Sequence, residues 1–546
     1  MVYNQSSNEI WMVFMALLSA DNSWFDLDHS RPFDVHTWSD YSEVNSFVGT
    51  IYDVYFSQDH ALSNIGKHHL KKVLIDLYVT WLDDPDLCIG FDLMPSKYKG
   101  NLRYNNLKIT RTTIDVVKAL SNAGLIDYVR GFRDRREGGQ SRKARMKATT
   151  TLIDQFNDAK INRFDIGFAI RIPKDRRLRP YEPVVMRIKK VDDLGRKINE
   201  DVEYEDTPKI QKMRKVLNNY NLLLVYHHID LSNNDARCVE SKGKRIWINQ
   251  QDKYTRRIFN NNKWNNGGRF YGGFWQRVPS EYRPFIRIDG KRTIEVDYSA
   301  HHPVLLYARK GINYWKDIET DPYIIEQKAP YDHPIWQRDI LKILLLTALN
   351  CSNDMEAIRA ARAEIYEDHR DKLRGIRLED NILIDALAAL REKHRPIKDL
   401  IARGRGIELQ YLDSQISEQI IKEFTKDNIP VLCVHDSYIV WEEYANDLHE
   451  VVNDAWRKLS RLSKKEITED VFGTPMPTNV KSKQIGYFDE EIDHEEEGGG
   501  KRHQEILALK ASEYVSQRHI DDLKAFEEWR DRPDNQETMR VMGLKQ

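Results

Sequence analysis

The sequence of 546 residues contains only four cysteines, and no two of them form a CxxC pair. Cys88, Cys238, Cys351 and Cys433 are too scattered to indicate a disulfide framework or a cysteine-ligated zinc site. Long apolar runs are also absent, since no stretch approaches the roughly 20 apolar residues of a membrane-spanning helix. The apolar stretch near the start has no basic residues before it, which favours a core-packing helix over a secretory signal. We therefore expect a cytoplasmic protein without a membrane partner.

The net charge of −1 excludes a general attraction to nucleic acids, so any such affinity must come from a local patch. One segment, residues 130–147, holds eight basic residues against Asp134 and Glu137: Arg130, Arg133, Arg135, Arg136, Arg142, Lys143, Arg145 and Lys147. Such a density of positive charge neutralises phosphates, which predicts contact with DNA or RNA. A solvated hairpin tip is the plainer alternative.

The pattern around this basic segment is typical of a winged helix. Residues 67–82 have the periodicity of an amphipathic helix, and a second helix is expected to begin at Thr110 or Thr112 and to end at Gly124. A strand over 125–132, the basic glycine-containing loop and a second strand follow. Arg111, at the start of the second helix, is a further candidate for contact with nucleic acid.

Two carboxylates occupy the ends of short apolar strands. In "TIEVDYSAHHPVLLYA", residues 293–308, Asp297 closes a strand, and in "DNIPVLCVHDSYIVWEE" Asp436 lies at the tip of a hairpin. If the strands are neighbours in one sheet, the carboxylates repel each other unless divalent cations lie between them. Two Mg²⁺ ions, for which Mn²⁺ can substitute, would then be the cofactors of a phosphoryl transfer.

A helix expected between these strands carries two cations on one face. Arg338 and Lys342 are four residues apart, and Leu346 and Asn350 continue the same face. Alone, this spacing usually marks a solvated helix surface. Beside a carboxylate pair, the two cations would instead bind the phosphates of a nucleoside triphosphate.

These segments resemble motifs A, B and C of the family A, or bacterial Pol I-like, polymerases and of the single-subunit phage-type RNA polymerases. The matching sequences are "VDYSAHHPVLLYA", "RDILKILLLTALN" and "VHDSYIV", within residues 293–308, 338–351 and 429–440. The upstream "NNGGRFYGGFWQRVP" resembles the Gly-Arg segment that contacts the primer-template. The helix-like "GIELQYLDSQISEQIIKEF" resembles the palm helix before motif C. The resemblance covers about a third of the chain.

The resemblance implies a role for each matching residue. Asp297 and Asp436 would hold the metal ions, and Arg338 and Lys342 the triphosphate, with Lys342 also protonating the pyrophosphate. His435 would hold the primer-end phosphate. Arg269 would contact the primer or minor groove, and Gln410 the template or primer. The face that Leu346 and Asn350 continue would border the nucleotide, together with His302.

The sequence departs from the family pattern where the sugar is selected. His302 stands where the DNA polymerases carry a Glu that blocks the ribose 2′-hydroxyl, Asn350-Cys351 replaces an aromatic-Gly pair, and Ser437 replaces a Glu as in the RNA enzymes. The Gly-Arg segment favours DNA synthesis, which we prefer. An RNA polymerase or primase with the same catalytic core is the alternative. There are two further alternatives. One is a winged-helix replication-initiation or regulatory protein with an inactive palm, and the other is a two-Asp nuclease.

We therefore predict an α+β protein with a right-hand polymerase fold, comprising a palm with an antiparallel sheet, helical fingers and a thumb-like region. The expected segments are an N-terminal helical segment (1–59), a winged-helix-like domain (60–155), a connecting thumb-like region (156–262), the palm and fingers (263–485) and a linker with a helical tail (486–546). Nucleic acid and nucleoside triphosphates are the expected partners.

Overall fold

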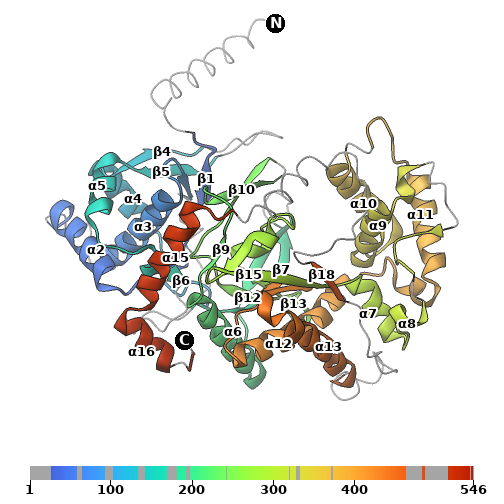
Figure 1. The fold of residues 1–546 in the computed structure, drawn as a ribbon. Coiled ribbons are helices and arrows are strands. Elements are labelled where there is room, and N and C mark those ends of the chain that lie inside the picture. The colour runs from blue at the N-terminus through green and yellow to red at the C-terminus, as the bar shows by residue number, and fades with distance from the viewer. Residues whose placement is uncertain are drawn as a thin grey trace, which may run out of the picture. The chain divides into compact units, whose positions relative to one another are not determined.

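The computed structural model is an α+β structure with mixed and antiparallel sheets (Figure 1). The chain divides into two compact units. The first comprises residues 1–181, 249–252 and 524–532, and the second residues 182–248, 253–523 and 533–546. The structure describes residues 26–57, 64–92, 103–132, 142–168, 181–191, 197–241, 243–318, 320–326, 333–370, 373–462, 482–485, 514–541 and 543–544. The expected N-terminal core helix and the basic residues 133–136 lie outside these ranges.

Four helices cover a four-stranded sheet in the first unit. The helices are α2 (Ser42–Tyr55), α3 (Asn64–Asp83), α4 (Thr112–Asn122) and α5 (Thr150–Asp158). The sheet order is β1 (Ser30–Pro32), β3 (Cys88–Phe91), β5 (Ala144–Ala148) and β4 (Ile126–Val129), with only β1 and β3 parallel. A two-stranded sheet joins β2 (Thr37–Trp38) to β6 (Gly167–Phe168).

The predicted helix, glycine stop and two strands are confirmed in this unit, whereas nearly all of the loop predicted between the strands lies outside the described residues. Gly124 follows α4 with a φ of +72°, a conformation that glycine adopts without the steric cost of a Cβ atom. The predicted helix over 67–82 lies inside α3. The strand predicted over 125–132 is continuous only over 126–129, and Phe132 pairs again with Arg142 in an isolated antiparallel bridge. The alternate residues Ala144, Met146 and Ala148 of β5 are buried against the core.

The second unit is built around a six-stranded sheet. Its order is β16 (Leu432–Val434), β17 (Ser437–Trp441), β15 (Lys291–Tyr298), β14 (Ile286–Ile288) and β9 (Ile229–Leu231), and β18 (Ser482–Ile485) also pairs with β15. A second sheet has the order β13 (Lys263–Gly272), β12 (Thr255–Asn260), β7 (Val184–Val191) and β8 (Lys197–Val202). A hairpin joins β10 (Cys238–Ser241) to β11 (Lys244–Trp247).

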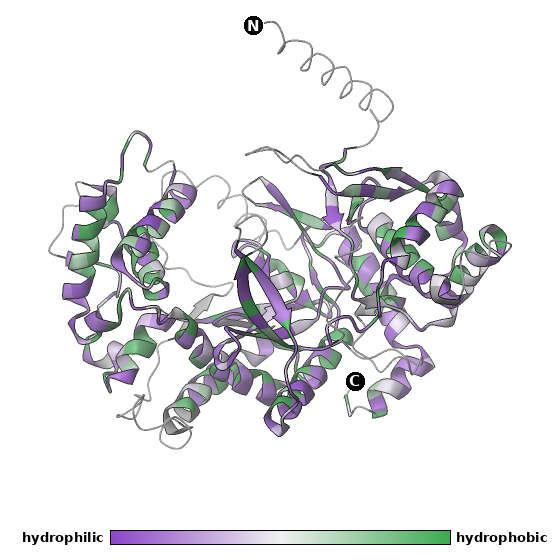
Figure 2. Cartoon of the chain, turned by 180° about the vertical axis from the view of Figure 1, so that it is seen from behind, coloured by the Kyte–Doolittle hydropathy of each residue, from purple (hydrophilic) through white to green (hydrophobic). Residues whose placement is uncertain are grey.

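Helices α6 (Pro208–Val225), α12 (Gly406–Lys426) and α13 (Ala445–Leu462) lie below these sheets in Figure 1. A group of further helices follows β15 in the chain and comprises α7 (His301–Arg309), α8 (Tyr314–Asp317), α9 (Arg338–Asn350), α10 (Asp354–Asp368) and α11 (Asp380–Lys393). Figure 2 shows apolar and polar residues interleaved along the helices, as expected where one side of a helix covers a core.

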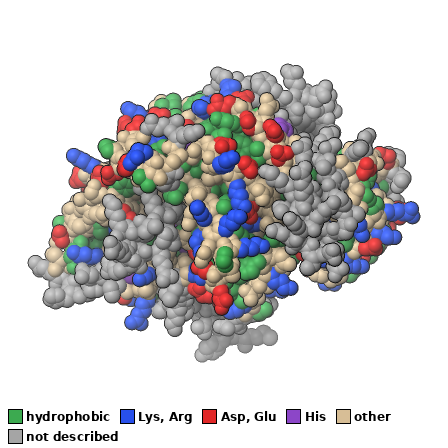
Figure 3. All heavy atoms as spheres, turned by 90° about the horizontal axis from the view of Figure 1, so that it is seen from below, with side chains coloured by type: hydrophobic (Ala, Val, Ile, Leu, Met, Phe, Trp, Pro, Cys, Tyr) green, Lys and Arg blue, Asp and Glu red, His purple; other side chains and the backbone are tan. Residues whose placement is uncertain are grey.

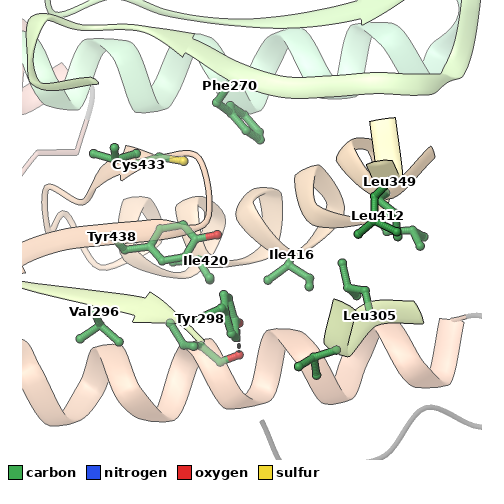
Figure 4. Close-up of a cluster of buried hydrophobic side chains, with 14 of the residues drawn as sticks. Phe270, Val296, Tyr298, Leu305, Leu349, Leu412, Ile416, Ile420, Cys433 and Tyr438 are labelled. Carbon is green, nitrogen blue, oxygen red and sulfur yellow. Dashed lines mark hydrogen bonds between the residues drawn. The ribbon is translucent and has the colours of Figure 1, made fainter. Parts of the chain in front are cut away.

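One hydrophobic core holds the central sheet and α12 together. Figure 4 shows Val296, Tyr298 and Tyr438 of the sheet beside Ile416 and Ile420 of α12. The hydroxyl of Tyr298 donates to the carbonyl of Val452 on α13 at 2.6 Å, which satisfies the polar end of a buried ring. Because side chains alternate along β15, Glu295 and Asp297 lie on the opposite face from Val296 and Tyr298. The core therefore anchors the strand whose other face carries the candidate site.

The described part of the predicted C-terminal tail is helical in α15 (Gln517–Arg530) and α16 (Pro533–Val541), whereas the predicted linker lies outside the described residues. Within the second unit, Arg518 and His519 of α15 bond to the carboxylate of Asp230 on β9, at 2.9 Å and 2.8 Å. Within the first unit, Phe526 packs edge-on against Phe164 at 5.1 Å between ring centroids.

On the face in Figure 3, Lys and Arg side chains gather near the centre among acidic and apolar ones. Positive charge is thus local in a chain of net charge −1.

Candidate active site

Two neighbouring strands bring Asp297 and Asp436 together. Strands β15 and β17 are antiparallel, with Asp297 opposite Ser437, the residue that follows Asp436. The amide of Tyr298 donates to the carbonyl of Asp436 at 3.4 Å, and both carboxylates are half-buried. The predicted adjacency of the two strand ends is therefore confirmed.

The hairpin tip that carries Asp436 is held in an unfavourable backbone conformation. His435 has a φ of +59°, which costs a residue with a side chain roughly 1–2 kcal/mol. Surrounding groups hold the turn: Gln276 Nε2 donates to the carbonyl of Cys433 at 2.8 Å, and the Ser417 hydroxyl donates to that of His435 at 3.3 Å. Backbone strain that is maintained in this way is concentrated at functional sites.

The two carboxylates create an excess of negative charge. Burial is the main cause that raises the pKa of Asp297 to about 8; Asp436 and Glu295 contribute to this increase, whereas Lys342 opposes it. Glu295 is itself compensated, because Arg283 donates to it at 2.9 Å and the Ser437 hydroxyl at 2.5 Å. Among the described residues, neither Asp297 nor Asp436 forms a salt bridge. The uncompensated charge therefore belongs to this pair.

The donor set of the pair fits Mg²⁺. Within the described part of the chain, no three His, Cys, Asp or Glu side chains form a metal-ligating group, so protein side chains offer the two carboxylates. Mg²⁺ is usually bound by one or two carboxylates, with substrate phosphates and waters completing its shell. A like charge that raises the pKa of a neighbouring carboxyl group, as Asp436 does for Asp297, also favours a cation between the two.

The predicted cationic helix is present, and its two cations share an aromatic ring. Arg338 begins α9 and donates to Asp321 at 2.8 Å. Its guanidinium lies 5.4 Å from the ring centre of Tyr323, and the Lys342 ammonium lies 6.0 Å from it. Lys342 is exposed, and its charge is felt at Asp297. The cationic face of the helix therefore borders the carboxylate pair.

Tyr323 was not among the predicted site residues. Its side chain is buried, and burial is the main cause that raises the pKa of its hydroxyl. Arg338 opposes this increase, whereas Asp321 and Asp436 add to it, so the charges of the cationic helix and of the hairpin tip both act on Tyr323. No spacing pattern connects residues 321–323 with α9, because the contact arises from the tertiary fold.

Leu346 and Asn350 continue the face of α9 as predicted, since neither is among the buried residues of the helix. Asn350 lies against Gly406 at the start of α12, where a Cβ atom would approach Asn350 Oδ1 to 1.8 Å. Gln410, one turn further along α12, is half-buried. Contact of these three residues with a nucleotide or template stays a prediction.

Arg269 and His302 meet beside Asp413, another residue that sequence patterns did not identify. Arg269 Nε donates to Asp413 Oδ2 at 2.5 Å, and Arg269 Nη2 lies 2.9 Å from His302 Nε2. Burial raises the pKa of Asp413 to about 7 against the influence of Arg269, and burial lowers the pKa of His302 to about 3. Asp436 adds to the increase in the pKa of Asp413 and opposes the decrease in that of His302, so this cluster borders the carboxylate pair.

The predicted nucleic-acid contacts in the first unit differ in exposure. Arg111 is exposed before α4, and Lys143 is 60% exposed at 3.9 Å from Asp92. Arg142 lies over the ring of Phe132 at 5.4 Å, and Arg145 Nε donates to the carbonyl of Leu27 at 2.8 Å. Arg135 and Arg136 lie outside the described residues. Arg145 thus uses part of its guanidinium within the unit itself.

No protein-family model matches this sequence, and no curated protein is significantly similar to it. Across the described residues, none of the helices combines the length and apolar character needed to cross a membrane. The functional conclusion therefore depends on the residues and geometry of the candidate site.

Proposed function

We propose that this protein is a template-directed nucleotidyltransferase that adds nucleotides to a nucleic-acid 3′ end, with DNA synthesis preferred. The observation that carries the proposal is the placement of Asp297 and Asp436 on adjacent strand ends, with Lys342 close enough to influence the pKa of Asp297. The carboxylate pair attracts cations and the exposed Lys342 attracts anions, and this combination suits a metal-bound triphosphate.

Each group has a distinct role in the proposed reaction. Asp297 and Asp436 would hold two Mg²⁺ ions, which lower the pKa of the attacking hydroxyl and neutralise phosphate charge when bound. The 3′-oxygen attacks the α-phosphorus, and the bond between that phosphorus and the oxygen bridging to the β-phosphate breaks. Arg338 and Lys342 bind the triphosphate, and Lys342 gives a proton to the departing pyrophosphate.

The preference for DNA synthesis depends on the residues near the sugar. The Ser437 hydroxyl donates to Glu295, so its proton is used within the sheet. His302 presents a ring of substantial volume in the first turn of α7, where it would crowd a 2′-hydroxyl. An RNA polymerase or primase with the same site is the alternative, and it would accept ribonucleotides.

Template binding is assigned to the basic segment of the first unit and to Arg269, His435 and Gln410 of the second. The order of α4, β4 and β5 and the exposed Lys143 support a winged-helix-like contact with phosphates. A replication-initiation or regulatory protein with an inactive palm would use the same segment. The retained Asp297, Asp436, Arg338 and Lys342 favour an active enzyme.

Primer extension by the full-length chain tests the proposal. Purified protein is supplied with a primer on a DNA or RNA template, with Mg²⁺ or Mn²⁺, and with either deoxynucleoside or nucleoside triphosphates. We expect extension with deoxynucleotides that EDTA, Asp297→Ala and Asp436→Ala each abolish. Lys342→Ala should slow the reaction about 10²- to 10³-fold, because it removes charge from the leaving group.

The other outcomes separate the alternatives. Extension with ribonucleotides alone would identify an RNA polymerase or primase. Degradation of the nucleic acid without triphosphates would identify a nuclease. Tight binding of nucleic acid with no incorporation of either nucleotide, under any of these conditions, would favour a DNA-binding protein with an inactive palm.

A further inference from the structure

Asp413 is a buried acid that is paired with a cation of the candidate site. Its side chain is 1% exposed, and it lies on α12, inside the core of the second unit. Oδ2 accepts from Arg269 Nε, whereas Oδ1 accepts no hydrogen bond within the described part of the chain and lies 3.7 Å from His301 Nε2. A buried carboxylate is costly, so its retention needs a reason.

Arg269 connects this acid to His302. The guanidinium is only 14% exposed and uses Nε for Asp413 and Nη2 for His302. A guanidinium has donors and no acceptor, so Nε2 of His302 must accept this hydrogen bond. The proton of the neutral imidazole is then on Nδ1, and the ring is held in one tautomer and one orientation.

The position of His302 relates this chain of contacts to the reacting nucleotide. His302 lies in the first turn of α7, five residues after Asp297, and the charge of Asp436 is felt at both His302 and Arg269. In the proposed reaction the carboxylate pair holds the reacting phosphates, and the sugar of the incoming nucleotide is bonded directly to the α-phosphate. A polar ring beside the pair therefore faces that sugar.

We propose that Asp413 is a positioning residue for sugar selection: through Arg269 it fixes His302 as a neutral imidazole with the δ-proton, and this ring discriminates deoxyribose from ribose. The inference rests on the proposed nucleotidyl transfer and adds a residue to it that touches neither metal nor substrate. Its role differs from packing, because loss of the carboxylate leaves the helix core intact but frees Arg269 and His302 to move.

Single-nucleotide incorporation by the full-length chain tests this role. The specificity ratio, kcat/KM for a deoxynucleotide divided by that for the matching ribonucleotide, is measured for wild type, Asp413→Asn, Arg269→Lys and His302→Ala. We expect Asp413→Asn and Arg269→Lys each to bring the ratio about tenfold closer to one, because a charge-assisted hydrogen bond is lost. The double variant Asp413→Asn/His302→Ala should match His302→Ala alone, since coupled residues are not additive.

Asp427→Asn, an exposed acid at the end of the same helix, is the matched control and should leave the ratio unchanged. An unchanged ratio in an active Asp413→Asn variant, or additive effects in the double variant, would overturn the inference while leaving the polymerase proposal intact. No incorporation by wild type with either sugar would instead overturn the polymerase proposal and this inference with it.

A second measurement does not depend on activity. The ¹⁵N shifts of the His302 ring, assigned with His302→Gln, report which nitrogen carries the proton. The δ-proton form is expected in wild type and a mixture of both tautomers in Asp413→Asn or, if that variant does not fold, in Arg269→Lys. An ε-proton form in wild type would contradict the assigned contact.

Discussion

Four histidines of the second unit have neutral rings: His228, His301 and His394 are buried, and His302 is half-buried. Burial is the main cause that lowers the pKa values of His228, His301 and His302 to about 3 and that of His394 to about 4. His394 is fully satisfied in the neutral form: Nε2 lies 2.8 Å from the carbonyl of Pro322, and Nδ1 lies 3.0 Å from the hydroxyl of Tyr307. It thereby anchors the loop that carries Asp321 and Tyr323 beside α9.

His394 should make the protein sensitive to mild acid. The unfolded chain takes up a proton near pH 6.5, but the native ring does so only near pH 4, so the stabilisation present above pH 6.5 is lost as the pH falls toward 4. Between pH 7 and pH 5, wild type should lose about 2 kcal/mol more of its unfolding free energy than His394→Gln. Urea unfolding at the two pH values measures this difference, and equal losses in the two proteins would refute it.

Sequence patterns identified the candidate-site residues that lie at the ends of apolar strands or repeat at helical spacing. Asp297 and Asp436 end apolar strands, and Arg338 and Lys342 repeat at helical spacing. Each of these features can be recognised within a short stretch of the sequence. Asp413 and Tyr323 were not identified, because Asp413 lies among apolar residues of a long helix and Tyr323 lies in a loop. Asp413 contacts Arg269 from 144 residues away, and the Tyr323 ring contacts Arg338 and Lys342 of a separate helix.

At the scale of elements, a close approach of two elements positions the site. Strand β13 approaches α12 at Gly268, which has a φ of +79°, and a Cβ atom there would lie 2.8 Å from Phe259 Cε1 and 2.9 Å from Ser414 Oγ. The carbonyl of Gly268 accepts from the buried Arg257 at 2.9 Å. This glycine therefore fixes the backbone next to Arg269.

Gly268→Ala should be more destabilising than a glycine substitution made at the same backbone angle in open space. Gly243, in the hairpin between β10 and β11, has a φ of +72°, and a Cβ atom added there would have no neighbouring atom within 4 Å. The free energy of unfolding should fall by about 1 kcal/mol in both variants because of the left-handed backbone. In Gly268→Ala it should fall by about 1–3 kcal/mol more because of overpacking. Equal unfolding free energies of the two variants in urea would show that the close approach is absent.

The basic hairpin of the first unit predicts a separate effect on binding. Lys143 is 60% exposed, whereas Lys147 is 16% exposed and pairs with Asp86 at 2.9 Å. If the hairpin binds nucleic acid, Lys143→Ala should weaken binding to all sequences and reduce the slope of log affinity against log salt by about 1. Lys147→Ala is the control with a smaller expected slope change, and fluorescence anisotropy over a salt series compares them. An identical slope in Lys143→Ala and wild type would remove Lys143 from the interface.

The same hairpin shows the limit of sequence patterns for elements. Gly124 predicted where α4 ends, and the strand predicted after the basic loop is present as β5. The pattern did not distinguish Lys143 from Arg145, although Arg145 bonds to the carbonyl of Leu27, which is 118 residues away. Charge density alone therefore overstates how many basic side chains are free to contact phosphates.

At the scale of the whole molecule, the candidate site lies within one unit. Asp297, Asp436, Arg338, Lys342 and Asp413 all belong to the second unit, and the basic hairpin belongs to the first. The α+β class was predictable from the alternation of strand and helix patterns. The division of the chain into two units was less predictable. Residues 249–252 and 524–532 belong to the first unit although they are distant from it in the sequence, and no change in composition indicates this.

The central claim is that the Asp297–Asp436 pair supports metal-dependent transfer of nucleotides. Its most direct test is the single-turnover rate of nucleotide addition to a primer with Mg²⁺, measured for wild type, Asp436→Asn and the control Asp427→Asn. We predict equal rates for wild type and control, no reaction in EDTA, and a loss of at least about 10²-fold in Asp436→Asn. An Asp436→Asn variant as fast as wild type, or a wild type that adds neither deoxynucleotides nor ribonucleotides, would contradict the claim.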